Sequence, residues 1–199
     1  MHVRDEGNTR HVTIHPGEHY VSRDRVIVST LLGSCVSACL YDPINKVIGM
    51  NHFLLSNKRY SRDRQVCLTE AGRYGIHAME LVINDMLKLG AKRSNLRAKA
   101  FGGSALLGTR CKSDNFPCVG EVNCRFIREF LNNDEIPLIA SNLGGDRGRV
   151  IRFSSVDYTV RMRIIKKSVA PELANKEKRF WLNSIKSHDV ATPEPDLWG

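Results

Sequence analysis

The sequence lacks the features that most readily identify membrane, secreted and zinc-binding proteins. No apolar run reaches about 18 residues, so no membrane-spanning helix is expected. The first residues contain no apolar signal core, which favours a cytoplasmic protein whose cysteines stay reduced. The six cysteines form no Cys-x-x-Cys pair, so a structural zinc site is not predicted.

The composition is that of an ordinary globular protein with a basic excess. The 199 residues are 42% hydrophobic and 26% charged, and this length favours one domain with a real core. The formal net charge is +9, concentrated at residues 58–64 (four basic, one acidic) and 161–179 (seven basic, two acidic). Tyr60 is the only aromatic residue in the two stretches, so neither has the repeated aromatic residues of a base-stacking surface. Solvated basic loops and an acidic protein partner are therefore favoured over nucleic-acid binding, which would weaken steeply with salt.

Hydrophobic periodicity predicts a single α/β domain at residues 25–167. Residues 1–24 are expected to form an irregular N-terminal segment, and residues 168–199 a basic C-terminal extension that is partly helical or disordered. Two amphipathic helices are predicted at residues 69–89 and 119–131. Strands are predicted at residues 25–30, 36–41, 46–55, 96–101, 137–142, 149–154 and 158–165.

The second and third predicted strands form a β-hairpin. Residues 36–41 and 46–55 are apolar-rich and are separated by Asp42 followed by proline, which favours a type I turn. If the loop contains two residues, Cys35 lies directly opposite His52 on one face of the hairpin. Opposed residues have Cβ atoms about 4.5–5.5 Å apart, which is within reach for a thiol and an imidazole.

This pairing suggests nucleophilic catalysis. An imidazole can take the proton of Cys35 to leave a thiolate, and His52 can later protonate a leaving group. Backbone N–H groups around Ser34 and Cys35 can stabilise an oxyanion. The alternative is a small core cysteine near a hydrogen-bonded histidine, and a one-residue register slip would put the pair on opposite faces.

Several ordered segments resemble the chemoreceptor glutamine deamidases, the CheD family. They cover residues from about 20 to 167 and have the following sequences: TLLGSCV (30–36), CLYD (39–42), GMNHF (49–53), RYG (73–75), AKAFGG (98–103) and LGG (143–145). Residues 119–123 match a further family segment only in part, so Asn123 is not assigned a role.

The resemblance implies a single α/β domain with layered mixed β-sheets flanked by helices. It also implies an enzyme that hydrolyses selected glutamine side chains of methyl-accepting chemotaxis receptors to glutamate and ammonia. Cys35 would be the nucleophile and His52 the general base and acid, while Ser29 or Thr30 would hold the histidine. No cofactor or metal ion is implied.

The implied partners are the cytoplasmic region of the receptors and, in some members, a CheC-type phosphatase. No membrane insertion is expected. The alternative function is a non-catalytic adaptor that binds the receptor or the phosphatase.

Overall fold

The structure is a computed structural model that describes residues 1–55, 65–105, 119–166 and 170–190. The strands of this part form two five-stranded sheets. The first sheet has the order β1 (His2–Glu6), β2 (Thr9–Thr13), β4 (Val26–Leu32), β9 (Arg149–Ser154), β10 (Val160–Ile164). The second has the order β3 (His19–Ser22), β6 (Val47–Asn51), β5 (Val36–Asp42), β7 (Arg97–Gly102), β8 (Leu138–Leu143). The α-helices are α1 (Glu70–Lys88), α2 (Val119–Asn133) and α3 (Ala170–Val190).

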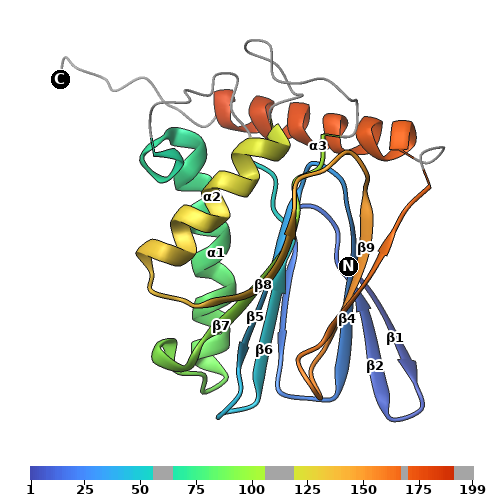
Figure 1. Cartoon of the computed structure of the whole chain (residues 1–199), viewed down its shortest axis with the longest axis vertical. Coiled ribbons are helices and arrows are strands. Elements are labelled where there is room, and N and C mark those ends of the chain that lie inside the picture. Colours follow the sequence, from blue (N-terminus) through green and yellow to red (C-terminus); the bar gives the residue numbers. More distant parts are fainter. Residues whose placement is uncertain (56–64, 106–118, 167–169, 191–199) are drawn as a thin grey trace.

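The elements pack in three layers, with α3 laid across one end (Figure 1). Helices α1 and α2 cover one face of the second sheet, and the first sheet lies on the opposite side of it. One apolar cluster fills the space between the helices and the second sheet, and another lies between the two sheets. Both sheets are mixed, because β2 pairs parallel with β4 and β7 pairs parallel with β8. The predicted fold class is therefore confirmed.

The first predicted helix begins and ends close to the expected residues. The side chain of Thr69 accepts a hydrogen bond from the backbone N–H of Gly72, which caps the first turn of α1. Gly90 follows the helix with φ of +93°, a conformation that favours glycine after a helix C-terminus. Local sequence signals thus predict where this helix begins and ends.

The expectation of an irregular segment at residues 1–24 is wrong. This stretch contains β1 and β2, which form an antiparallel pair, and β3, which pairs with β6. All five residues of β1 are exposed, so this strand has no buried face and no apolar alternation in its sequence. It is held at the edge of the sheet by backbone hydrogen bonds to β2, and its mostly polar sequence gives no sign of that pairing.

The predicted hairpin register is wrong by two residues. Cys39 lies opposite Met50 and Asp42 opposite Val47, so the β5–β6 loop contains four residues, 43–46, instead of two. The side chain of Asp42 accepts hydrogen bonds from two backbone N–H groups of this loop, and Lys46 has φ of +56°. These features stabilise the longer loop. A shift of two residues preserves which side chains share a face of the sheet.

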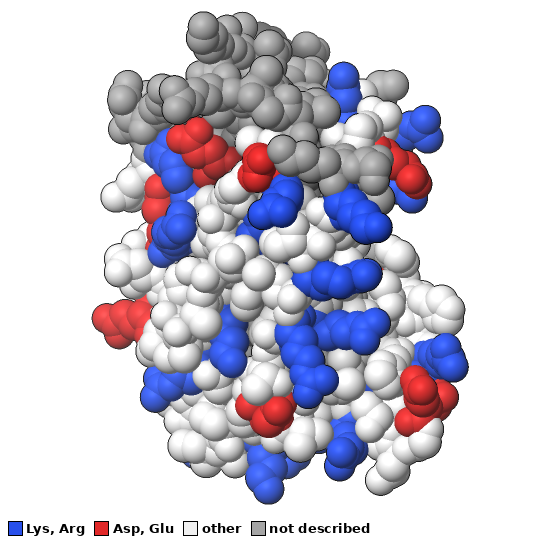
Figure 2. Space-filling model, turned by 45° about the vertical axis from the view of Figure 1, so that its right-hand side comes forward, with Lys and Arg blue, Asp and Glu red and all other residues white. Residues whose placement is uncertain are grey.

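The outer face of the first sheet is basic. Strands β1, β9 and β10 contribute exposed arginines to it: Arg4, Arg152, Arg161 and Arg163. Figure 2 shows Lys and Arg side chains gathered over this side of the molecule. The other basic stretch, residues 58–64, lies outside the described residues. No helix in the described part of the chain has the length and apolarity needed to cross a membrane.

Candidate active site

A three-residue loop, residues 33–35, joins β4 to β5 at the end of the sheets that α3 covers. All three of its carbonyl groups accept hydrogen bonds from the body of the protein. The donors are the backbone N–H of Ser104 for Gly33 (2.7 Å), the side-chain amide of Asn123 for Ser34 (2.8 Å) and the backbone N–H of Gly103 for Cys35 (2.7 Å). These bonds hold the loop so that its own N–H groups can bind another group.

The N–H groups of this loop converge on the carboxylate of Glu177 from α3. Gly33 donates to Oε1 at 2.8 Å and Ser34 to Oε2 at 2.7 Å, while the N–H of Cys35 lies 3.5 Å from Oε1. The hydroxyl of Ser34 donates to Oε2 at 2.6 Å. Consecutive backbone donors that meet at one oxygen-bearing group have the geometry of an oxyanion hole.

His52 is oriented by Thr30. The hydroxyl of Thr30 donates to the carbonyl of Ile14 and lies 2.7 Å from Nδ1 of His52. A hydroxyl has one proton, so Thr30 must accept a hydrogen bond from Nδ1–H. This assigns the imidazole proton to Nδ1 and leaves a lone pair on Nε2. Nε2 is buried and has no hydrogen-bond partner among the residues that the structure describes.

The reactive groups of three buried residues lie together. The sulfur of Cys35, a ring nitrogen of His52 and a carboxylate oxygen of Glu177 are all within 4.8 Å of one another. This set has the atom types of a metal site, but the Glu177 oxygens already accept hydrogen bonds from the 33–35 loop. The arrangement is therefore better explained as a thiol and a base beside an occupied oxyanion hole.

The protonation states are those of a closed site. Burial raises the pKa of the Cys35 thiol well above its usual range, and the charge and hydrogen bond of Glu177 raise it further. Burial lowers the pKa of His52 to about 3, and the nearby His15 adds to this effect while Glu18 opposes it. Burial thus favours the uncharged form of both groups, and it disfavours a thiolate–imidazolium pair in the closed site.

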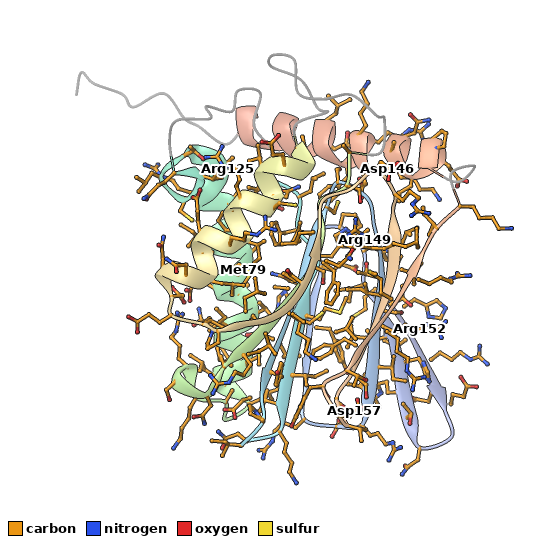
Figure 3. The ribbon with its side chains drawn as sticks, viewed as in Figure 1. Met79, Arg125, Asp146, Arg149, Arg152 and Asp157 are labelled. Carbon is orange, nitrogen blue, oxygen red and sulfur yellow. The ribbon has the colours of Figure 1, made fainter. Side chains whose placement is uncertain are left out.

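A buried arginine, Arg149, stabilises the residues that hold the 33–35 loop. Arg149, labelled in Figure 3, lies near the end of the sheets beneath α3. Its guanidinium donates to the hydroxyl of Ser104 at 2.7 Å and also contacts the carbonyls of Asn142 and Gly144. Because the N–H of Ser104 holds Gly33, Arg149 helps to fix the loop that contains Cys35.

The structure brings together three of the four residues singled out from the sequence. Cys35 and His52 are adjacent, and of the two candidate hydroxyl residues Thr30 is the one that contacts His52. Ser29 lies 3.1 Å from the hydroxyl of Thr13 and donates to the carbonyl of Val12, so its side chain is not part of this site.

Two residues of the site were not assigned from the sequence: the role of Asn123 was left open, and Glu177 was missed. Asn123 is a fully buried polar residue on an otherwise apolar helix face, a pattern that indicates a hydrogen-bonding role. Glu177 had no such signal, because it lies in a charged segment 142 residues after Cys35.

Comparison with known proteins identifies relatives of this chain. A family model described as "CheD chemotactic sensory transduction" matches residues 54–164. A probable chemoreceptor glutamine deamidase CheD 1 of Geobacter sulfurreducens is 52% identical over 198 residues, which cover 99% of this chain and 98% of the relative. A probable chemoreceptor glutamine deamidase CheD 2 of Shewanella oneidensis is 45% identical over 174 residues, covering 85% of each chain.

Solved structures align less closely. A hypothetical protein, YfiH, of Bacillus licheniformis covers 58% of this chain and 46% of its own, with a TM-score of 0.34 and 14% identity. This likeness is too weak to support an argument. The family model and the full-length relatives confirm the resemblance found in the sequence, and the chain belongs to the CheD family.

Proposed function

We propose that this protein hydrolyses the carboxamide of selected glutamine side chains in methyl-accepting chemotaxis receptors, yielding glutamate and ammonia. The observation that supports this function best is that the residue 33–35 N–H groups all face one carboxylate, that of Glu177, beside Cys35 and His52. An amide carbonyl held in place of that carboxylate would develop its negative charge against these donors. The names of the relatives supply the receptor as substrate.

The first half of the reaction forms a thioester. Nε2 of His52 takes the proton of Cys35, and the sulfur forms a bond to the carboxamide carbon. The carbonyl oxygen becomes an oxyanion in the place where Glu177 now accepts hydrogen bonds. His52 then donates its proton to the amide nitrogen, the carbon–nitrogen bond breaks and ammonia leaves.

The second half regenerates the thiol. His52 takes a proton from water, and the water oxygen forms a bond to the thioester carbon. The carbon–sulfur bond breaks, the proton returns to the sulfur and glutamate is released. Thr30 keeps Nε2 available for each transfer because it accepts the hydrogen bond from Nδ1–H. The chemistry uses no redox step.

The test is receptor deamidation by purified protein. Cytoplasmic receptor fragments would be incubated with the wild type, Cys35→Ala and Cys39→Ala, and ammonia and the mass of receptor peptides would be followed. Cys39 is the matched control, because it is a second buried cysteine, on the strand that follows the loop. We expect a gain of about 1 Da at particular glutamines with the wild type and Cys39→Ala only.

Two outcomes would contradict the proposal. One is a mass shift that persists in Cys35→Ala. The other is the absence of any shift with the wild type and with Glu177→Ala, which removes the carboxylate from the site. The adaptor function would instead be favoured if a Cys35→Ser variant restored full chemotaxis in a strain that lacks the protein.

A further inference from the structure

The candidate active site is closed to a protein substrate in this structure. Cys35 has an exposed fraction of 0% and His52 of 2%, so no side chain of another protein can reach the sulfur. The cover is α3, which contributes Glu177, itself only 2% exposed. A nucleophile that acts on another protein must be uncovered before it can react.

The covering residue has the chemistry of the reaction product. Glu177 is a glutamate, and its carboxylate lies where the proposed reaction would leave the carboxylate of a deamidated glutamine. The loop donates to both carboxylate oxygens, and these charge-assisted bonds are stronger than those to a neutral amide. The carboxylate of Glu177 is also buried, unlike that of an ordinary ion pair on the protein surface.

The helix is docked by apolar contacts on the same face. Leu173, Ala174 and Glu177 are buried, and Phe180 packs against the cluster between the sheets. Glycines allow the close approach, since an added Cβ would lie 2.9 Å from Leu173 at Gly148 and 3.2 Å from Phe180 at Gly17. The neighbouring residues Glu172 and Lys176 pair with each other in solvent.

We propose that α3 is an internal competitor, in which Glu177 occupies the subsite of the substrate carboxamide and must leave before a receptor glutamine can enter. This inference deepens the proposed function and rests on it for the identity of the competing substrate. Docking of α3 fills the oxyanion hole with a negative charge beside the sulfur. Its departure exposes Cys35, frees the three N–H groups and removes the charge that disfavours a thiolate.

The geometry makes the side chain of a Glu177→Gln variant an internal substrate. With a carboxamide at this position, the sulfur of Cys35 would bond to the carboxamide carbon and ammonia would leave with a proton from His52. Water would then break the carbon–sulfur bond and convert residue 177 to glutamate. Each molecule would react once, at a rate that does not depend on protein concentration.

The first experiment follows the mass of the peptide that contains residue 177 in purified full-length protein. Glu177→Gln is compared with Glu172→Gln, an exposed glutamate on the same helix, and with Glu177→Gln combined with Cys35→Ala. We expect a gain of about 1 Da in the Glu177→Gln protein alone, because only that carboxamide meets an intact thiol. Equal gains with and without Cys35 would overturn the assignment of this subsite.

The second experiment measures uncovering without requiring hydrolysis. The rate at which iodoacetamide alkylates Cys35 is determined by peptide mapping in the wild type, Glu177→Ala, Leu173→Ala and Glu172→Ala. Leu173→Ala weakens docking without touching the carboxylate. We expect alkylation of Cys35 to be about tenfold faster in Glu177→Ala and in Leu173→Ala than in the wild type, since each lost contact favours the open state. Glu172→Ala should react at the wild-type rate.

The two experiments separate the two proposals. Unchanged alkylation in both Glu177→Ala and Leu173→Ala would overturn the competitor role, even if the wild type deamidates receptors through Cys35. Faster alkylation, with no deamidation of receptors or of residue 177 in the Glu177→Gln variant, would support the cover and contradict the hydrolase. A receptor rate that rises in Glu177→Ala together with alkylation would support both.

Discussion

The side-chain amide of Asn123 ties together the two chain segments that contain Cys35 and His52. Its Nδ2 donates to the carbonyl of Ser34 at 2.8 Å, and its Oδ1 accepts from the N–H of Leu55 at 2.9 Å. One buried residue on α2 therefore fixes the loop before the nucleophile and the chain just after the proposed base. Replacing this amide with an apolar group would remove both hydrogen bonds.

Replacement of Asn123 by leucine should lower both stability and activity. The substitution takes a hydrogen-bond partner from two backbone groups, and we expect the free energy of unfolding to fall by about 2 kcal/mol or more. Urea unfolding of Asn123→Leu measures this loss. Asn132→Leu is the control, because Asn132 is exposed on the same helix. Equal losses in both variants would contradict a specific role for the Asn123 amide.

Thr30→Val should slow turnover by about 10- to 100-fold, with a smaller effect on KM. The variant keeps the shape of the side chain but removes the oxygen that accepts from Nδ1–H of His52. Thr30→Ser keeps the hydroxyl and should retain most of the activity. Steady-state receptor deamidation measures kcat and KM.

The neighbouring hydroxyl is the control for this prediction. Ser29 bonds to Thr13 and Val12 and does not contact His52, so Ser29→Ala should leave kcat nearly unchanged. If Ser29→Ala is as slow as Thr30→Val, the proposal that Thr30 orients the imidazole of His52 is wrong.

Gly102→Ala should destabilise the protein more than Gly144→Ala. Both glycines have positive φ, of +116° and +83°, so each substitution strains the backbone by about 1 kcal/mol. At Gly102 the new Cβ would also lie 2.1 Å from the carbonyl oxygen of Cys35, whereas at Gly144 nothing lies within 4 Å. We expect a further loss of about 1–3 kcal/mol in Gly102→Ala and a lower kcat, because Cys35 must move. Thermal unfolding and receptor deamidation measure the two effects, and equal behaviour of the variants would refute the clash.

Asp42 should stabilise the fold above about pH 4. Burial raises the pKa of this carboxyl, but hydrogen bonds from Asn45, Lys92 and Ile44 outweigh burial and lower the pKa from 3.8 to about 2. The folded state therefore binds the proton less tightly than the unfolded state. Its contribution, about 2 kcal/mol, is present above the unfolded pKa and is lost as pH falls from about 4 to about 2.

Urea unfolding of the wild type and Asp42→Asn across this range provides the measurement. The deficit of Asp42→Asn should shrink by about 2 kcal/mol between pH 5 and pH 2. A deficit that does not change with pH would show that the charge of Asp42 has no part in stabilising the β5–β6 loop.

Most of the elements could be predicted from local patterns. The apolar spacing and the Thr69 cap predict α1 because helix periodicity and capping act within a few residues. Strand β1 could not be found in this way, because its pairing with β2 buries none of its side chains. The hairpin follows from its two apolar runs, but its loop length depends on hydrogen bonds of the Asp42 side chain that the turn preference alone does not specify.

The sequence determined that Cys35 and His52 share a face of the hairpin, since alternation along two adjacent strands survives a register error of two residues. The prediction that they lie directly opposite each other is wrong, because the β5–β6 register differs by two residues. The choice of Thr30 over Ser29 required the structure, because adjacent residues of β4 point to opposite faces and only the packing of the sheets shows which face meets His52. The position of Glu177 depended wholly on tertiary structure. No local pattern predicts that a helix from the end of the chain will place its carboxylate against a loop 142 residues earlier, because that contact is set by the packing of α3 across the sheets.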